Sequence, residues 1–523
     1  LQDVVITEMR LKTGNASPTT VYTNNTTATT MHMASRWTKE FWIGGAPSGI
    51  TIDHNMTYLM STEIIPNFDP AKSISEATTA TDYTGWTASA KNLYDLAGWN
   101  ADMAQAGGQW YVSPMNGSVV KYLYTFDNRY RENLLGHADL FASYPFHFRE
   151  GTTGKKFDRA ALVDAMGKIF SVNARPSEFF SYANGSLTIP TVGTTSDGGW
   201  LVDGAHQPDA HFVPYLLTGD FWYLEEMQYF ASWGAGNTAA AIRGPNGYNG
   251  HIAGQIRAQA WMFRNRMNAA FLSPDGTDEK TYFELLVDEC IAAWEGRMAL
   301  TGSSFEGNTM WGWADTAAAP SLTINGLRTP PLRHWTTGET GFVQEPMDAA
   351  VVAEASSPWE ENFLLWSLAR GKEFGYATNT LVTWFAQHTI NQVNQGGNWD
   401  PWFSGAYRIP VQQVSDGFYF TTWDALATGY QAGDYEASWN NDILESEGGF
   451  PFITLAAVGM VANEPGGTAA WNWVSARALN AAALLQNPKW ALAPRSLEAG
   501  VDFALSPDAI LAQTNLSGAV ANI

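Results

Sequence analysis

A pattern that occurs twice constrains the fold of this chain more than any other feature. The spacing Y-L-x-T-x-D-x-x-Y-x-E begins at Tyr122 and again at Tyr215, 93 residues later. In the second copy Gly219 can adopt a positive φ angle, and Asp220 can cap the helix that follows. The pattern therefore predicts a helical hairpin. Its duplication indicates that hairpin units are repeated, which favours a closed ring or a stacked solenoid.

Further helices are predicted on both sides of this hairpin. Residues 251–298 have the periodicity of two amphipathic helices, and the turn signal at Ser273–Gly276 separates them. Pro358 is expected at the start of a helix. Other helical patterns follow in residues 378–393, 450–464 and 468–487, whereas residues 71–117 are predicted to form a long connection.

The two ends of the chain differ from its middle. Residues 1–52 are rich in β-branched side chains and turns, which predicts a β-rich N-terminal arm or the remnant of a β domain. Residues 53–495 hold the helical patterns, and residues 496–523 are expected to form a C-terminal tail. The predicted fold class is therefore mainly α, with helical hairpins, long loops and a short β-rich segment at the N-terminus.

Composition narrows the possible partners. The net charge of −22 opposes binding to nucleic acid and to anionic membranes. Cys290 is the one cysteine, so no disulfide can form within the chain, and its apolar neighbours predict a buried thiol. The sequence shows neither an apolar run long enough to span a membrane nor a signal peptide. Because the sequence begins with Leu1, processing and export are expected, with an extracellular or cell-surface location.

Three segments resemble a known group of proteins. They are residues 215–226 (YLLTGDFWYLEE), 254–276 (GQIRAQAWMFRNRMNAAFLSPDG) and 357–376 (SPWEENFLLWSLARGKEFGY). In the order of their hairpins they resemble the (α/α) toroids of polysaccharide lyases and six-hairpin glycosidases. This resemblance implies that residues 53–495 form a toroid, that loops at one end bear the catalytic residues, and that the substrate is a glycan.

The central segment carries candidate residues for a lyase. Such an enzyme needs a base to remove the proton next to a carboxylate, and a group that neutralises the carboxylate. His211 and Tyr215 have the spacing of one helix face, and His206 with Asp203 precedes them. These four are the predicted catalytic residues. Tyr215 has an alternative role as hairpin scaffold, because Tyr122 occupies the same place in the other copy.

A glycoside hydrolase would instead need two carboxylates on either side of a sugar. The sequence leaves several candidates open: Asp203, Asp209, Glu345, Glu360, Glu361 and Asp400. Glu225 and Glu226 are expected to be solvated charges. A metal site built from residues 203–211 is disfavoured, because its two histidines are five residues apart and not four. No cofactor is predicted, although loop carboxylates are compatible with a structural calcium ion.

Aromatic and basic residues are candidates for substrate binding, because sugar rings stack on aromatic faces and arginine complements acidic sugars. The predicted substrate-binding residues are Trp110, Trp311, Trp313, Trp359, Trp402 and Arg257. Anchoring of loops into the core is the alternative role for these tryptophans. Arg257 and Arg264 have helical spacing, which is also typical of structural ion pairs.

Three function classes follow from these features. The first is an exported glycan-active enzyme, a polysaccharide lyase or a glycoside hydrolase, whose partner is a polysaccharide or oligosaccharide. The second is a non-catalytic structural subunit of an extracellular filament, surface layer or virion, which self-assembles through the N-terminal arm. The third is a carbohydrate-binding protein without turnover.

Overall fold

A computed structural model describes the chain in separate stretches. They are residues 4–24, 29–31, 51–91, 95–103, 110–144, 202–237, 256–300, 358–406, 450–479 and 481–495, with short pieces at 36, 146–147, 252, 322–324, 327–329, 355–356, 409–410, 423–424 and 427–428. Trp311, Trp313, Glu345 and the expected tail 496–523 lie outside them.

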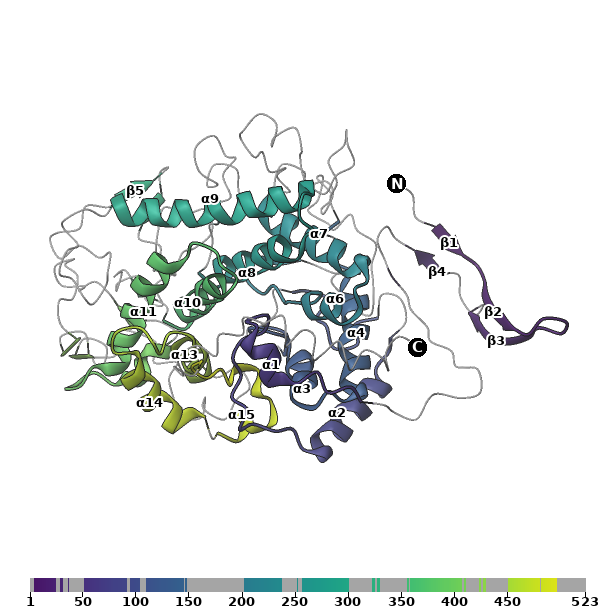
Figure 1. Ribbon diagram of the computed structural model, residues 1–523, viewed down its shortest axis with the longest axis horizontal. Helices are drawn as coiled ribbons and strands as arrows, with labels where there is room; N and C mark the ends of the chain where they lie inside the picture. Colours follow the sequence, from purple (N-terminus) through teal and green to yellow (C-terminus); the bar gives the residue numbers. More distant parts are fainter. Residues whose placement is uncertain are drawn as a thin grey trace, which may run out of the picture.

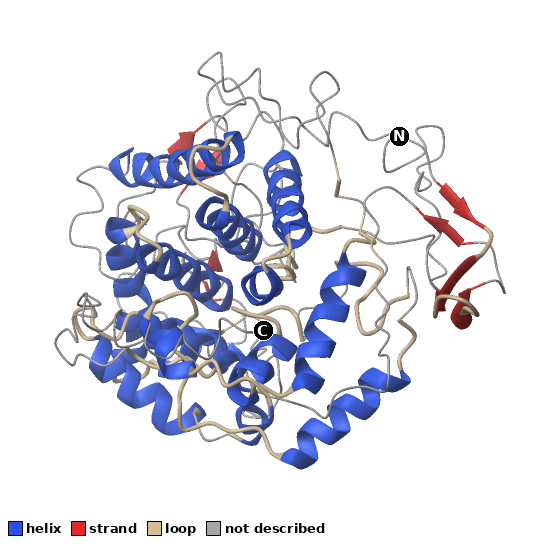
Figure 2. Cartoon of the chain, turned by 45° about the vertical axis from the view of Figure 1, so that its right-hand side comes forward, coloured by secondary structure: helices blue, strands red, loops and turns tan. Residues whose placement is uncertain are grey.

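The described part of the chain is mainly helical, as the sequence predicts (Figure 1 and Figure 2). Its helices are α1 (Met56–Ser61), α2 (Glu76–Ala88), α3 (Gly117–Thr125), α4 (Asn128–Phe141), α6 (Phe212–Thr218), α7 (Phe221–Asn237), α8 (Ile256–Leu272), α9 (Asp278–Leu300), α10 (Pro358–Glu373), α11 (Asn379–Asn394), α13 (Phe450–Met460), α14 (Gly467–Ala478) and α15 (Ala482–Gln486), with 3-10 turns η5 (Pro401–Gly405) and η7 (Pro488–Trp490).

Short strands form two-stranded antiparallel ribbons. Near the N-terminus β1 (Val4–Ile6) pairs with β4 (Thr29–Met31), and β2 (Met9–Thr13) pairs with β3 (Thr19–Asn24). Further along the chain β5 (Leu322–Ile324) pairs with β6 (Leu327–Thr329), and β7 (Ala355–Ser356) pairs with β8 (Ile409–Pro410). The expected β-rich arm is therefore present, and Figure 1 shows β1 to β4 beside the helices and away from their core.

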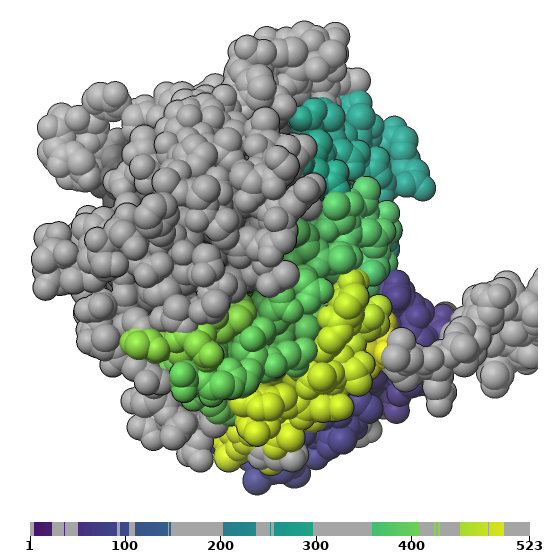
Figure 3. Space-filling model, turned by 90° about the vertical axis from the view of Figure 1, so that its left-hand side faces the viewer, coloured from purple at the N-terminus to yellow at the C-terminus, as the bar shows by residue number. Residues whose placement is uncertain are grey.

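The helices form an inner, almost fully buried set and an outer, partly exposed set. Nearly every residue of α8, α10 and α13 is buried, whereas α9, α11 and α14 lie outside them (Figure 1). Figure 3 shows the segments 256–300, 358–406 and 450–495 (teal, green and yellow) side by side on one face. Arg257 meets Glu360 at the starts of α8 and α10, and Met267 lies near Gly371 towards their ends, so the two helices are parallel.

The contacts between successive elements form a closed circuit. Each neighbouring pair in the series α3, α4, α6, α7, α8, α10, α13 and η7 is in contact, and η7 contacts α3 again. The Asn362 amide donates to the Thr454 hydroxyl near the starts of α10 and α13, and Glu373 and Met460 at their ends line one pocket, so α13 runs in the same direction as α10. Phe68 and Leu492 form an antiparallel bridge that joins the first and last parts of the helical body.

The first copy of the duplicated pattern is a helical hairpin. Tyr122 is in the last turn of α3, and its carbonyl accepts from the Phe126 amide at 2.6 Å. The Asp127 amide donates to the Thr125 hydroxyl at 3.2 Å, and the Asp127 carboxylate caps α4 by accepting from the Arg129 amide at 2.8 Å. Phe126 has the positive φ of 50° that closes the turn.

The second copy repeats these bonds one by one. The Tyr215 carbonyl accepts from the Gly219 amide at 2.8 Å, and the Asp220 amide donates to the Thr218 hydroxyl at 3.1 Å. The Asp220 carboxylate accepts from the Trp222 amide at 3.0 Å, and Gly219 has a φ of 64°. The prediction of two hairpins from one spacing is therefore confirmed.

The second tyrosine of the pattern also has one role in both copies. The Tyr130 hydroxyl donates to Asp82 at 2.7 Å, and the Tyr223 hydroxyl donates to Asp139 at 2.8 Å. The first bond joins α4 to α2, and the second joins α7 to α4, so each links the second helix of a hairpin to a helix outside that hairpin. The pattern thus specifies a turn together with the packing of the next helix.

Substitution of two glycines tests whether the turn requires a positive φ angle. A Cβ at Gly219 would meet no other atom, but φ is positive there, so Gly219→Ala is expected to lower the free energy of unfolding by about 1 kcal/mol. Gly85 is equally open but lies inside α2 with ordinary helical φ, so Gly85→Ala is expected to raise it by about 0.5–1 kcal/mol. Urea unfolding of both variants checks this, and equal signs would refute the conformational argument.

The prediction of a long connection over residues 71–117 is wrong where α2 lies. Ser75 caps this helix by accepting from the Thr78 amide, and the hydroxyls of Thr81 and Thr84 bond to carbonyls one turn earlier. Trp86 and Thr79 supply its buried contacts. Because α2 has few apolar side chains, its sequence lacks the periodicity that marks a helix.

Candidate functional site

Two non-helical segments run between the helices and are almost wholly buried. They are residues 110–116 and 202–211, and Arg264 of α8 joins them. Its guanidinium donates to the Ser113 carbonyl at 2.9 Å and to the Gln207 carbonyl at 2.7 Å. Arg264 is 2% exposed. The expected structural role of Arg264 is therefore borne out by its bonds.

Asp209 lies in the second of these segments. Burial raises its pKa to about 6, although the charge of Arg264 and the Asn268 amide partly oppose this shift. Burial in turn lowers the pKa of Arg264 to about 10, with Asp209 opposing it. Both groups lie in the interior of the fold, where the charge of Arg264 favours the ionised form of Asp209.

At the start of α8 three predicted residues come together. Asp203 accepts from His206 Nδ1 at 2.6 Å and from the Ala205 amide at 2.8 Å. Burial opposes ionisation of Asp203, but His206 and the charge of Arg257 outweigh it and lower the pKa of the carboxyl. Because an ionised carboxylate can only accept, His206 Nδ1 is the donor, and Nε2 of a neutral imidazole is left as a proton acceptor.

The first turn of α10 adds two buried carboxylates to this end of the fold. Arg257 Nε lies 3.4 Å from Glu360, and His388 of α11 lies 3.3 Å from Glu361. Glu360 and Glu361 are 1% and 2% exposed. Acidic residues suit the first turn of a helix, but buried ones also need partners such as these. Of the hydrolase candidates, Glu360 thus shares Arg257 with Asp203.

His211 and Tyr215 lie elsewhere. His211 precedes α6, and its Nε2 lies 3.1 Å from the Ala138 carbonyl, with its ring against Phe141 and Trp222. Burial lowers the pKa of His211 to about 3, so it is neutral at pH 7 and unsuited to neutralising a carboxylate. Tyr215 is half-buried on α6 and serves the hairpin turn, which matches its alternative role as scaffold.

The buried His211 predicts loss of stability in acid. Its folded pKa of about 3 is below the unfolded value of about 6.5, so stability is present above pH 6.5 and is lost as the pH falls. From pH 7 to pH 5 this site is expected to contribute about 1–2 kcal/mol of that loss. His137 acts in the same direction, and Asp209 acts in the opposite one.

A variant isolates this contribution. His211→Gln keeps a donor for the Ala138 carbonyl but takes up no proton, so urea unfolding at pH 7 and pH 5 should show a smaller loss than in the wild type. The exposed His54 provides the control, His54→Gln. If His211→Gln lost as much free energy of unfolding between pH 7 and pH 5 as the wild type, His211 could not be the source of this loss.

The described tryptophans of the predicted site pack against protein groups. Trp110 donates to the Gly98 carbonyl at 3.0 Å and packs on Trp99 and His137. Trp359 is 4% exposed and packs between Arg257 and the rings of Phe363 and Phe450. Trp402 packs edge-on against Trp473 of α14. Loop and core anchoring therefore accounts for the contacts of Trp110 and Trp359.

The sequence missed one buried carboxylate. Glu226 of α7 was expected to be solvated, but it is 1% exposed and lies 2.6 Å from His147 Nε2. The His147 ring stacks on Phe146. Nothing near Glu226 in the sequence marks this contact, because its partner lies 79 residues earlier.

The chain matches no protein-family model, and neither a curated protein nor a solved structure is detectably similar to it. Among the described residues, no helix is both long and apolar enough to cross a bilayer. Within the same residues, His, Cys, Asp and Glu side chains do not gather in groups of three or more that could hold a metal ion.

Proposed function

We propose that the hairpins of this chain form an (α/α) toroid and that the protein is an exported glycan-active enzyme. The circuit of helix contacts from α3 to η7 and back supports the toroid. The turns that follow α8, α10 and α13 are short, at 273–277, 374–378 and 461–466, as expected of linked helical hairpins.

The observation that carries the enzymatic proposal is the Asp203–His206 pair beside Arg257, at the start of α8. His206 Nε2 would take the proton next to the carboxylate of an acidic sugar, with Asp203 orienting the imidazole. Arg257 would neutralise the substrate carboxylate, a charge that must be stabilised as the proton leaves. The electron pair left on carbon would then form a carbon–carbon double bond and expel the glycosidic oxygen, to which the His206 imidazolium would return the proton. This β-elimination is the reaction of a polysaccharide lyase.

Glycoside hydrolysis is the alternative chemistry for the same place. Asp203 and Glu360 both interact with Arg257, and Glu361 follows Glu360 in the first turn of α10. Two carboxylates in such positions could serve as acid and base on a neutral glycan.

The products separate these chemistries. The purified protein would be incubated with polygalacturonate, alginate and hyaluronan, and separately with xylan, mannan and starch. A lyase releases unsaturated uronates, which absorb in the ultraviolet, and a hydrolase releases new reducing ends without them. Absence of both products from every polysaccharide would refute the enzymatic proposal, and binding without product would favour a carbohydrate-binding protein.

A second candidate function is self-assembly through the N-terminal β-arm, defined here as residues 4–24 and 29–31. Its apolar side chains Val5, Leu11 and Val21 are 59%, 40% and 43% exposed. Two-stranded ribbons are marginally stable alone, and their open edges pair readily with other strands. A second copy of this chain would supply such strands, as in a structural subunit of a filament, surface layer or virion.

Introducing charged residues into the arm tests this function. The full chain is expected to form oligomers by light scattering, and the double variant Val5→Lys with Val21→Lys is expected to be monomeric because like charges would face each other in the assembly. Exposed lysines far from the arm, as in Thr87→Lys on α2, serve as the control. A wild-type chain that stays monomeric at high concentration would exclude assembly through the arm.

A further inference from the structure

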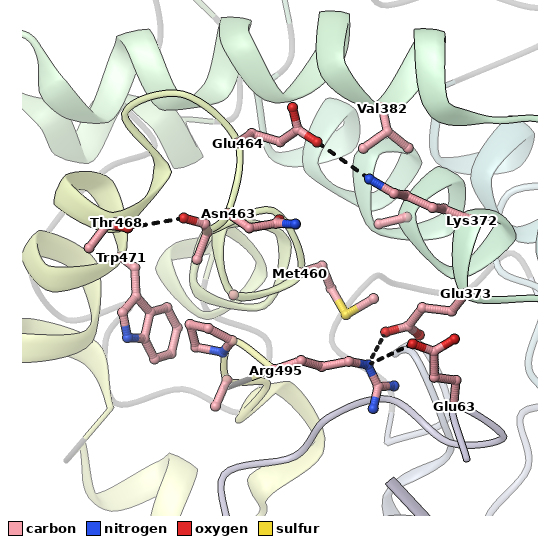
Figure 4. Close-up of a pocket in the computed structure, with 15 residues that line it drawn as sticks. Glu63, Lys372, Glu373, Val382, Met460, Asn463, Glu464, Thr468, Trp471 and Arg495 are labelled. Atoms are coloured by element: carbon pink, nitrogen blue, oxygen red, sulfur yellow. Dashed lines mark hydrogen bonds and ion pairs between the residues drawn. The ribbon is translucent and has the colours of Figure 1, made fainter. Parts of the chain in front are cut away.

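A pocket of about 580 Å³ lies at the other end of α10 from the proposed catalytic groups. It is formed by the ends of α10 and α13, the start of α14, and the segment that precedes Arg495 (Figure 4). Glu360 is in the first turn of α10 and Lys372 is in the last, so the two sites are about 18 Å apart along the helix. The pocket therefore cannot belong to the site described above.

One part of the pocket wall is apolar. Trp471 of α14 lines the pocket together with Met460 (Figure 4), and Pro494 is also part of the lining. The Trp471 ring also approaches the α13 backbone, since a Cβ on Gly459 would lie 3.2 Å from it. The indole thus presents part of its surface to the pocket from a fixed position.

Charged side chains occupy the opposite part, and they are paired. Lys372 Nζ lies 3.6 Å from Glu464, and Arg495 Nε lies 2.5 Å from Glu373 and 4.0 Å from Glu63 (Figure 4). Arg370 does not line the pocket, but it pairs with Glu373 as well. The three carboxylates of the wall are thus each paired with a cation, so a ligand of either charge would have no uncompensated partner here.

We propose that this pocket binds a short neutral oligosaccharide. The apolar face of a pyranose ring can stack on Trp471. Its hydroxyls both donate and accept, so they suit Glu464 as acceptor and Lys372 as donor, with the Asn463 amide able to do either. An entirely apolar ligand would instead desolvate these ions without replacing their hydrogen bonds. The volume lies within the range of about 300–1,000 Å³ of small-molecule sites.

This inference is independent of the catalytic proposal, because it uses other residues at the other end of α10. The test is isothermal titration of the full chain with maltotriose, cellotriose, mannotriose and trigalacturonate. At least one of the three neutral sugars should bind, and more tightly than trigalacturonate. Trp471→Leu and Asn463→Ala should each weaken that binding at least tenfold.

Matched variants separate a lost site from a damaged fold. Trp473 lies on the same helix but packs on Trp402 outside the pocket, so Trp473→Leu should bind as the wild type does. Asn463 is exposed, so Asn463→Ala reports on the pocket even where Trp471→Leu is unstable. Binding of none of the neutral sugars, equal binding by Asn463→Ala, or preference for trigalacturonate would overturn the proposal.

Discussion

Arg264→Leu is expected to lower the free energy of unfolding by about 3–5 kcal/mol, the usual cost of removing one member of a buried charged set. Arg264 donates to the carbonyls of both Ser113 and Gln207, so its loss removes a hydrogen-bond donor from two buried carbonyl oxygens. It also removes a positive charge that favours ionisation of Asp209. Chemical unfolding, followed by far-ultraviolet circular dichroism, measures the effect.

An exposed arginine provides the control. Arg477 lies over the Trp473 ring and donates to the Trp473 carbonyl, both at the surface of α14, so Arg477→Leu should cost no more than about 1 kcal/mol. Arg264→Lys keeps the charge but not the planar fork, and it should fall between the two. Equal effects at Arg264 and Arg477 would show that the two buried segments do not depend on Arg264.

His206→Ala is expected to lower kcat about 10²–10⁴-fold on the glycan that the product assay identifies, since this is the usual contribution of a proton-transfer group. Circular dichroism should show that the fold persists. Arg257→Lys should also lower kcat for an acidic glycan, because the ammonium ion lacks the bidentate geometry with which the guanidinium would stabilise the developing charge. Full activity in His206→Ala would remove His206 from the reaction.

Asp203 is a positioning residue in this proposal, and its variant has a separate signature. Asp203→Asn should lower kcat with little change in KM, because the imidazole loses the carboxylate that orients it for proton transfer. His54→Gln, at an exposed site, should leave both constants unchanged. An unchanged kcat in Asp203→Asn would remove Asp203 from this role.

The hairpins could be predicted from the sequence because their information is local. The turn at Gly219 needs a residue that tolerates positive φ and a cap at Asp220, and both lie within a few residues of each other. Helix α2 escaped prediction because threonine hydroxyls and one buried tryptophan, and not an apolar stripe, support it.

The candidate site was predictable only in part. Asp203 and His206 are three residues apart, so their pairing follows from local spacing. Their proximity to Arg257, and the contact of Glu361 with His388, depend on how separate helices pack. The same holds for Arg264, whose partner Ser113 is 151 residues away. Long-range contacts of this kind leave no periodic signal in a single sequence.

The bridge between Phe68 and Leu492 has a consequence for how the chain could be rearranged. Asp69 N donates to the Ala491 carbonyl and Ala493 N donates to the Asn67 carbonyl, so the two ends of the helical body are neighbours. A circular permutant that links these ends and opens the loop at 273–277 would keep every helix next to its present partners. The order in which the hairpins are synthesised is thus separable from the architecture they build.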